Sequence, residues 1–299
     1  MLNLDKVKIS PQTLSRIAEI EAFRGEWDAL ERHTTALQTL GDVAGFGQKF
    51  KEVIKPWQHK PITVDLICTL HGIVTGAKSD GAYRTANFPL VIQQGTSIIG
   101  ALDTAEPEDI EPLMDKLVAW LQETLESKKF HPLLVIALFT SVFLQISPFE
   151  TGNHRLMRLL VILLMFRSGY SYAPYAALDR IIISRSQDYH DVLRYTQETL
   201  ENGKTDWEPW LQFFLYVLDE QKNELRSKLE SGGDRLAGMP ELSLQVMALF
   251  EDHKRLSMKE IIDLTKGRRS TLKLRLGELV DQGYLKRHGQ ARSTWYSRV

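Results

Sequence analysis

Apolar residues recur at spacings of three and four along most of this 299-residue chain. This spacing puts them on one face of an α-helix, and each such helix must bury that face against another element. The pattern is present in LSRIAEIEAFRGEWDAL, ITVDLICTLHGIVTG, DIEPLMDKLVAWLQETLES, LLVIALFTSVFLQI, RLMRLLVILLMF, SQDYHDVLRYTQETL and EPWLQFFLYVLDEQKNELRSKLE. The sequence therefore predicts a mainly α protein, and a hydrophobic fraction of 43% is enough to fill a large core.

Two segments depart from the helical spacing and suggest the domain organisation. In residues 83–101, β-branched residues flank QQGTS, which is typical of a β-hairpin with a glycine-containing loop. Residues 230–240 combine glycines with a proline and predict a linker. We therefore expect an N-terminal helical region over 1–60, a helical domain with the hairpin over 61–229, and a second domain over 241–299.

The charge is distributed unevenly between these parts. The chain has a formal net charge of -1, but residues 254–299 hold 12 basic and 4 acidic side chains, a local charge of +8. A basic segment at the end of an acidic chain favours a polyanionic partner for that segment.

Several sequence features bear on the compartment and on metals. Cys68 is the one cysteine of the chain, so no internal disulfide can form and a reducing compartment is expected. The longest apolar run, residues 159–166, is far shorter than the roughly 18 residues of a membrane span. No group of His, Cys, Asp and Glu has metal-ligand spacing. We expect a cytoplasmic protein with no membrane partner and no metal site.

Residues 241–299 have the order of a winged helix-turn-helix: helix, short break, helix, TKGRRS turn, long helix and a basic hairpin. The long helix would bury Leu272, Leu276 and Leu279 and present its basic side chains to the major groove of duplex DNA, with the wing on phosphates. Winged helices also serve as protein-interaction modules, and that alternative stays open. The expected nucleic-acid contacts are Arg268, Arg269, Lys273 and Arg275 on the helix and Lys286, Arg287 and Arg292 on the wing.

A polar turn containing Gly152 and Asn153 leads directly into an apolar helix that has Arg155 and Arg158 near its start. The N–H groups of a first helical turn have no acceptor within the helix, and the macrodipole favours negative charge there. Two arginines three residues apart lie on one face and can reach the same anion. This segment therefore predicts a phosphate site.

Residues 147–158, Ser-Pro-Phe-Glu-Thr-Gly-Asn-His-Arg-Leu-Met-Arg, resemble the Fic family signature His-Pro-Phe-x-(Asp/Glu)-Gly-Asn-Gly-Arg-x-x-Arg. Members of this family mostly transfer AMP from ATP to a hydroxyl side chain of a target protein. The flanking helices and the hairpin segment resemble the family too, over about residues 10–220. The resemblance implies a helical Fic fold with a β-hairpin flap, a protein target, and ATP or another nucleotide held by Gly152, Asn153, His154, Arg155 and Arg158.

Three positions depart from that signature. Ser147 stands at the position of the catalytic histidine, and a serine hydroxyl cannot act as a base near neutral pH without an activating group. Thr151 stands at the acidic metal ligand, and its neutral oxygen would hold Mg²⁺ less well than a carboxylate. His154 replaces a glycine and crowds the phosphates. We expect a catalytically impaired, nucleotide-binding transcription regulator; the alternative is an adenylyltransferase with an altered site, in which Glu150 or His154 stands in.

Many members of the family also have an inhibitory helix with the pattern (Ser/Thr)-x-x-x-Glu-(Gly/Asn). In GQKFKEV the resemblance implies Glu52 as the inhibitory residue opposite Arg158, although Gln48 and Val53 depart from the pattern. The segment SRIAEI, with Glu19, is a weaker candidate. Glu52 could equally be a solvated helix residue beside two lysines. Homo-oligomer formation and the identity of the target protein stay open.

Overall fold

The computed structural model describes residues 7–32, 55–76, 82–94, 96–176, 178–201, 205–236, 240–281, 284–289 and 294–298. These residues are mainly helical, as the apolar spacing predicts. They group into two compact units, one formed by the described residues up to Arg226 and the other by those from Ser227 on. Among the described helices, none combines the length and apolarity that a bilayer crossing requires.

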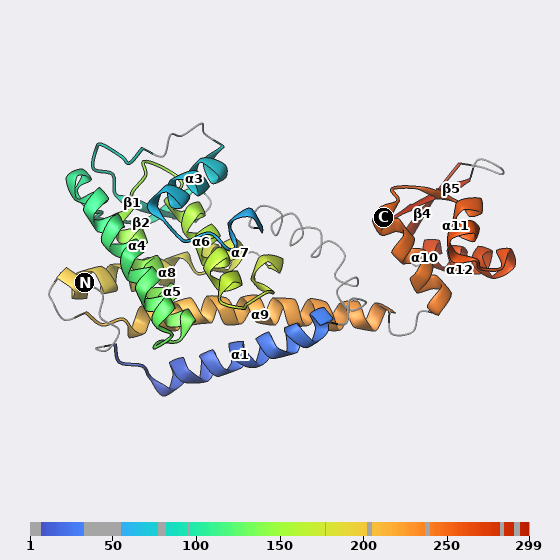
Figure 1. The fold of residues 1–299 in the computed structure, drawn as a ribbon, viewed down its shortest axis with the longest axis horizontal. Coiled ribbons are helices and arrows are strands. Elements are labelled where there is room, and N and C mark those ends of the chain that lie inside the picture. Colours follow the sequence, from blue (N-terminus) through green and yellow to red (C-terminus); the bar gives the residue numbers. More distant parts are fainter. Residues whose placement is uncertain are drawn as a thin grey trace. The chain divides into compact units, whose positions relative to one another are not determined.

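The larger unit is built of helices and one hairpin (Figure 1). Its hairpin pairs β1 (Leu90–Gln94) with β2 (Ser97–Leu102) in antiparallel register, as the sequence predicts. The helices, in chain order, are α1 (Pro11–Arg32), α3 (Val64–Thr75), α4 (Ile110–Ser127), α5 (Pro132–Ile146), α6 (Asn153–Arg167), α7 (Leu178–Ser184), α8 (Ser186–Glu201) and α9 (Glu208–Leu236), the last of which ends in the smaller unit.

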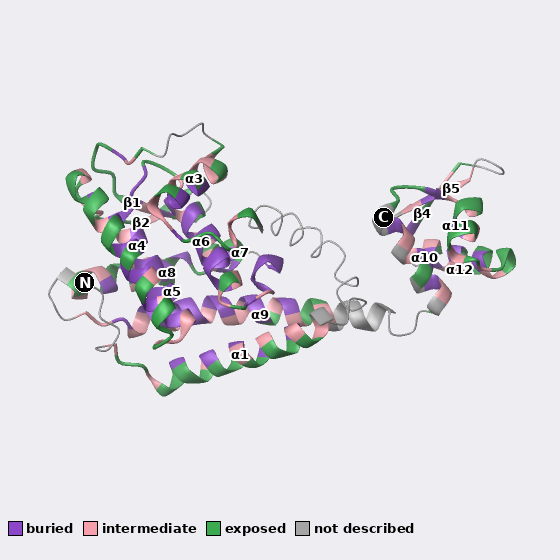
Figure 2. Ribbon diagram, viewed as in Figure 1, coloured by how far each residue is buried: buried purple, intermediate pink, exposed green. Residues whose placement is uncertain are grey.

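The centre of the larger unit is formed by α5 and α6, which pack against each other. Both helices are apolar on nearly all sides, and a helix of that kind must lie inside a protein. Buried residues accordingly gather along these two helices (Figure 2). The indole N–H of Trp210 on α9 donates to the carbonyl of Ala137 on α5 at 2.6 Å, which ties a third helix to this centre.

The hairpin is held against α8. A Cβ added at Gly100 of β2 would lie 2.3 Å from Nε2 of His190, so any other residue would have to displace this imidazole. The register also shifts between Ile92 and Gln93, as in a β-bulge. The position of the flap strand is thus set by a helix that lies about 90 residues further along the chain.

The helical pattern continues further than the glycines suggest. The sequence predicts a linker from Glu230, whereas α9 runs on to Leu236 and α10 begins at Glu241 after an N-cap at Pro240. Glycine weakens a helix interior by about 1 kcal/mol relative to alanine, which lowers helix propensity without forbidding the conformation.

The smaller unit contains α10 (Glu241–Asp252), α11 (Met258–Thr265), α12 (Arg269–Asp281) and the strands β3 (Leu256–Ser257), β4 (Leu285–His288) and β5 (Trp295–Arg298). The strands form an antiparallel sheet in the order β3-β5-β4. Ser257 and Glu260 form a capping box that starts α11. The predicted inward residues Leu272, Leu276 and Leu279 are buried in the core of this unit.

Candidate functional site

The loop between α5 and α6 begins and ends with a residue in the left-handed backbone conformation. Ser147 ends α5 with φ 46°, and its N–H donates to the carbonyl of Phe143 at 2.9 Å. Gly152 precedes α6 with φ 83°, and a Cβ there would lie 2.7 Å from Cγ2 of Thr75. Glycine is therefore needed at 152 both for the turn and for the close approach of α3.

The loop is held in place by the stacking of Phe149 on His71 and by the side-chain amide of Asn153. Phe149 is 1% exposed and stacks on the imidazole of His71 at 3.8 Å between ring centres. Nε2 of His71 donates to the carbonyl of Thr151 at 2.8 Å, since a carbonyl can only accept. The Asn153 side chain accepts from the N–H of Phe149 at 3.1 Å and donates to its carbonyl at 2.6 Å. Both polar atoms of this amide are used within the loop.

Arg84, which the sequence analysis did not single out, fixes the start of the loop to the base of the flap. Its side chain is buried, and burial lowers the pKa of Arg84, although a guanidinium stays charged in proteins. The backbone N–H of Arg84 also donates to the carbonyl of Pro148 at 3.0 Å. The guanidinium donates to six acceptors in three segments, namely Ala86 O (2.9 Å), Asn87 Oδ1 (3.4 Å), Thr104 Oγ1 (3.0 Å), Ala105 O, Ile146 O (3.3 Å) and Ser147 O (2.8 Å).

We expect Arg84→Ala to destabilise the larger unit by about 3–5 kcal/mol, because several buried carbonyls lose their donor at once. Arg84→Lys should also destabilise it, since an ammonium cannot reproduce the planar fork. Urea unfolding followed by tryptophan fluorescence measures the change. Arg180→Ala is the control, because Arg180 is exposed and its pair with Glu224 should contribute less than about 1 kcal/mol. A loss below 1 kcal/mol for Arg84→Ala would contradict the structural role.

The start of α6 offers free hydrogen-bond donors. Its N-cap, Gly152, has no side chain to cap the first turn. Arg155 lies in that turn with its side chain exposed, and among the described residues it has neither an ion pair nor a hydrogen bond. First-turn N–H groups and an unpaired guanidinium together can bind an anion. Asn153 offers only its backbone N–H to such an anion, because its side chain is engaged with Phe149.

Arg158, one turn further along α6, is in a different environment. Its guanidinium forms an ion pair with Asp179 at the start of α7, and its side chain is 19% exposed. Glu52, the predicted inhibitory partner of this arginine, lies outside the described residues. The weaker candidate, Glu19, lies 3.6 Å from the ammonium of Lys222 and not beside Arg158. Of the described carboxylates, Asp179 is the one paired with Arg158.

His154 is turned toward α8. Its Nδ1 shares a hydrogen bond with the hydroxyl of the buried Tyr189 at 3.2 Å. Burial, and then the positive charge of Arg158, lowers the pKa of His154 to about 4, so the imidazole is neutral at pH 7. By sequence, His154 is a candidate for a relocated general base. A group with a pKa near 4 is a weak proton acceptor at neutral pH.

The remaining loop residues supply few groups for acid–base or metal chemistry. Ser147 is buried, whereas Glu150 and Thr151 are exposed. Within the described ranges, no three His, Cys, Asp or Glu side chains come together as metal ligands would. The donor set around the loop therefore fits an anion better than Mg²⁺, which prefers carboxylates and phosphate oxygens.

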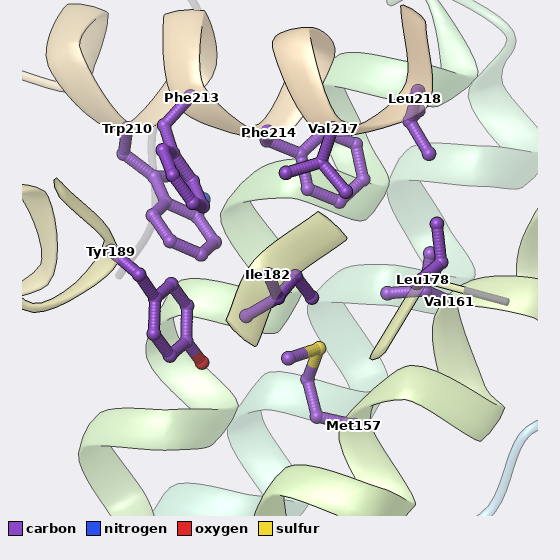
Figure 3. Close-up of a pocket in the computed structure, with 10 residues that line it drawn as sticks. All are labelled: Met157, Val161, Leu178, Ile182, Tyr189, Trp210, Phe213, Phe214, Val217 and Leu218. Atoms are coloured by element: carbon purple, nitrogen blue, oxygen red, sulfur yellow. The ribbon is translucent and has the colours of Figure 1, made fainter. Parts of the chain in front are cut away.

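A small cavity lies between α6 and the helices α7, α8 and α9 (Figure 3). Its volume is about 20 Å³, and apart from the Tyr189 hydroxyl its lining is apolar. Such a space holds at most one water, so it is a packing defect and not a nucleotide site. The lining residues are Met157, Val161, Leu178, Ile182, Tyr189, Trp210, Phe213, Phe214, Val217 and Leu218.

Five of the predicted nucleic-acid contacts of the smaller unit are exposed, and they fall into two groups. Arg268, Arg269 and Lys273 are exposed at and after the start of α12, and Lys286 and Arg287 are exposed on β4. Arg275, which was expected to face outward with them, is partly buried and forms an ion pair with Glu278 at 2.7 Å. Arg292 lies outside the described residues.

Comparison with solved structures identifies the class of fold. A Fic family protein from Desulfovibrio desulfuricans G20 matches with a TM-score of 0.59 and 17% identity, over 98% of this chain and 97% of that chain. A Fic-1 fragment from C. elegans matches with a TM-score of 0.50 and 18% identity, over 73% of each chain. At these identities the likeness shows the fold alone, and the fold is that of Fic proteins.

The sequence comparisons agree with the fold. Residues 61–165 match the model of the Fic/DOC family, so this region of the chain is similar to that family. The curated "Protein adenylyltransferase Fic" of Nematostella vectensis is 30% identical over 155 residues, which is 51% of this chain and 31% of that protein. The match thus spans about a third of the length of this relative.

Proposed function

We propose that this protein is a catalytically impaired Fic-domain regulator. In this proposal the larger unit binds a nucleotide or another phosphate-bearing ligand at the start of α6, and the smaller unit is a winged helix that binds duplex DNA. The observation that carries the first half is the unpaired, exposed Arg155 beside the uncapped first turn of α6. This arrangement supplies both charge and N–H donors to a phosphate.

Impaired catalysis follows from the groups around the loop. Ser147 offers a hydroxyl where the Fic signature has its histidine, and the neutral His154 is a weak base with a pKa of about 4. Thr151 offers a neutral oxygen where the signature has a carboxylate. General base catalysis is worth about 10²–10⁴ in rate, and metal charge neutralisation several kcal/mol more. The loss of both should leave little AMP transfer.

The DNA-binding half of the proposal rests on element order and charge. A capped helix, a second helix with exposed arginines at its start, and a hairpin with exposed basic residues occur in the order of a winged helix. Arg268, Arg269 and Lys273 on one element and Lys286 and Arg287 on another make phosphate contacts from two sides feasible. Duplex DNA would thus be the polyanionic partner expected for the basic residues 254–299.

The alternative function is AMP transfer from ATP to a protein hydroxyl with an altered set of catalytic groups. It is favoured by the 30% identity to a curated protein adenylyltransferase. This alternative predicts ATP binding that depends on Mg²⁺, because a productive nucleotide needs its metal. The regulator proposal instead predicts ATP binding that requires Arg155 and changes little when Mg²⁺ is removed.

A calorimetric titration with ATP, with and without Mg²⁺, tests the anion site. We expect binding at millimolar or lower ATP in both conditions, and a weakening of about tenfold or more in Arg155→Ala because one charge-assisted contact is lost. Arg194→Ala is the matched control, since Arg194 is an exposed arginine on α8. Absence of ATP binding, or equal affinity of the two variants, would refute the phosphate site.

A further inference from the structure

Arg158 is the second arginine at the start of α6, and its charge is already matched within the protein. Its Nε forms an ion pair with Oδ1 of Asp179, which lies in the first turn of α7. The Arg158 side chain is 19% exposed, so solvent screens this pair only in part. An anion that binds Arg158 must therefore displace the Asp179 carboxylate or share the guanidinium with it.

The neighbours of Arg158 on the side of α8 add no charge. Burial, and then the charge of Arg158, lowers the pKa of His154 to about 4, so the imidazole is neutral at pH 7. Burial raises the pKa of Tyr189, although the charge of Arg158 acts in the opposite direction, and its hydroxyl stays protonated. These two neutral side chains share a hydrogen bond with each other. Among the described residues, the charged partner of Arg158 is thus Asp179.

The unmatched positive charge of the site comes from Arg155 and from the first turn of α6. Arg155 is exposed, and a helix N-terminus adds about half an elementary charge. A phosphate monoester carries a charge of about −1.5 to −2 at pH 7, which these groups can largely offset. A second or third phosphate group would be repelled by Asp179, whose side chain is 53% exposed, and by the exposed Glu150 of the loop.

Resting on the proposed anion site, we propose that Asp179 determines which phosphate compounds this site prefers. The carboxylate occupies the guanidinium to which a second phosphate group would bind, so the site takes a phosphate monoester and prefers a triphosphate no more strongly. Without Asp179, two arginines three residues apart on one helix face could hold successive phosphate groups. A single phosphate group also needs no metal ion to offset repulsion between phosphates, which agrees with the Mg²⁺-independent binding expected above.

A comparison of AMP with ATP isolates the effect of the added phosphate groups, because both contain the same nucleoside. In calorimetric titrations of the full chain without Mg²⁺, the wild type should bind the two with affinities within about threefold of each other. Asp179→Asn keeps the side-chain shape but releases Arg158, so ATP should bind about tenfold more tightly through one added charge-assisted contact. Its affinity for AMP should change by less than about threefold. The tenfold increase should disappear in the double variant Asp179→Asn/Arg158→Gln.

Asp188→Asn is the matched control. Asp188 also lies in the first turn of a helix, α8, and its exposed carboxylate pairs with Arg185, so the change in net charge is the same. This variant should leave the ratio of ATP affinity to AMP affinity unchanged.

Two outcomes would refute the role of Asp179 while leaving the proposed phosphate site intact. One is a wild type that binds ATP at least about tenfold more tightly than AMP, which would mean that Arg158 is available despite its ion pair. The other is an equal change in ATP affinity in Asp179→Asn and Asp188→Asn, which would show only a general effect of net charge. If the wild type binds neither nucleotide, or if Arg155→Ala leaves both affinities unchanged, the phosphate site and the role of Asp179 are refuted together.

Discussion

The affinity of the full chain for duplex DNA is expected to fall by about 10²–10³ between 50 and 200 mM salt. Each phosphate that a basic side chain neutralises releases a condensed counterion, so the logarithm of the affinity falls with a slope of about 0.9 per contact. About five contacts are expected from the exposed residues of the predicted interface, which are Arg268 just before α12, Arg269 and Lys273 on α12, and Lys286 and Arg287 on β4. The slope measures how many of them touch phosphate.

Single substitutions separate positioning contacts from base contacts. Arg287→Ala should weaken binding to all DNA sequences to a similar degree, and it should reduce the slope of log affinity against log salt concentration by about one. Arg269→Ala or Lys273→Ala should also alter the preference among DNA sequences. Arg275→Ala is the internal comparison, because Arg275 is ion-paired with Glu278 and should contribute less. Binding weaker than the ~10⁻⁴ M limit of ordinary non-specific affinity, or binding indifferent to salt, would make the smaller unit a protein-interaction module.

The helical architecture could be predicted because its cause is local. Spacings of three and four along α5 and α6 show directly which residues must be buried, and the β-branched residues around QQGTS indicate the hairpin. The end of α9 was predicted less well, since the glycines after Glu230 lower helix propensity without ending the helix. The existence of a helix or hairpin could thus be predicted from the pattern within that element, but the residues at which it ends could not.

The contacts that shape the candidate site could not be predicted, because their partners are distant in the chain. Arg84 donates to carbonyls near Ala105 and Ser147, and a backbone carbonyl has no sequence signal. Asp179 pairs with Arg158 only because α7 packs near α6. The side-chain amide of Asn153 could be predicted to lie in the turn, but its use within the loop depends on the left-handed residues at each end.

His154 shows how burial changes the chemistry of a residue type. By sequence it is a candidate base, because an unperturbed histidine titrates near neutral pH. In the fold it lies against Tyr189 and near Arg158, and both desolvation and the like charge oppose protonation. The same residue type therefore contributes a neutral imidazole that packs against α8.

No AMP transfer is expected from the wild-type protein to itself or to a protein target incubated with labelled ATP. The physical reason is the joint loss of the base and of the metal ligand, because Ser147 cannot titrate and the Thr151 oxygen is neutral. Labelling above background that disappears in Arg155→Ala would show that the altered site is active, and the adenylyltransferase alternative would then replace the regulator.

Substitution toward the Fic signature should recover activity only when the positions are changed together. Ser147→His alone supplies a base, and histidine tolerates the left-handed backbone at this residue better than most side chains. We expect it to stay near background, since Thr151 is a poor metal ligand and position 154 still has a side chain where the signature has a glycine. Combining Ser147→His with Thr151→Asp and His154→Gly should raise labelling by about 10² or more, in line with the contribution of a general base.

The same combination with Arg155→Ala should return to background, because a recovered reaction still needs the phosphate site. Full activity from Ser147→His alone would mean that the base is the sole missing group, and equal labelling with and without Arg155 would mean that the nucleotide binds elsewhere.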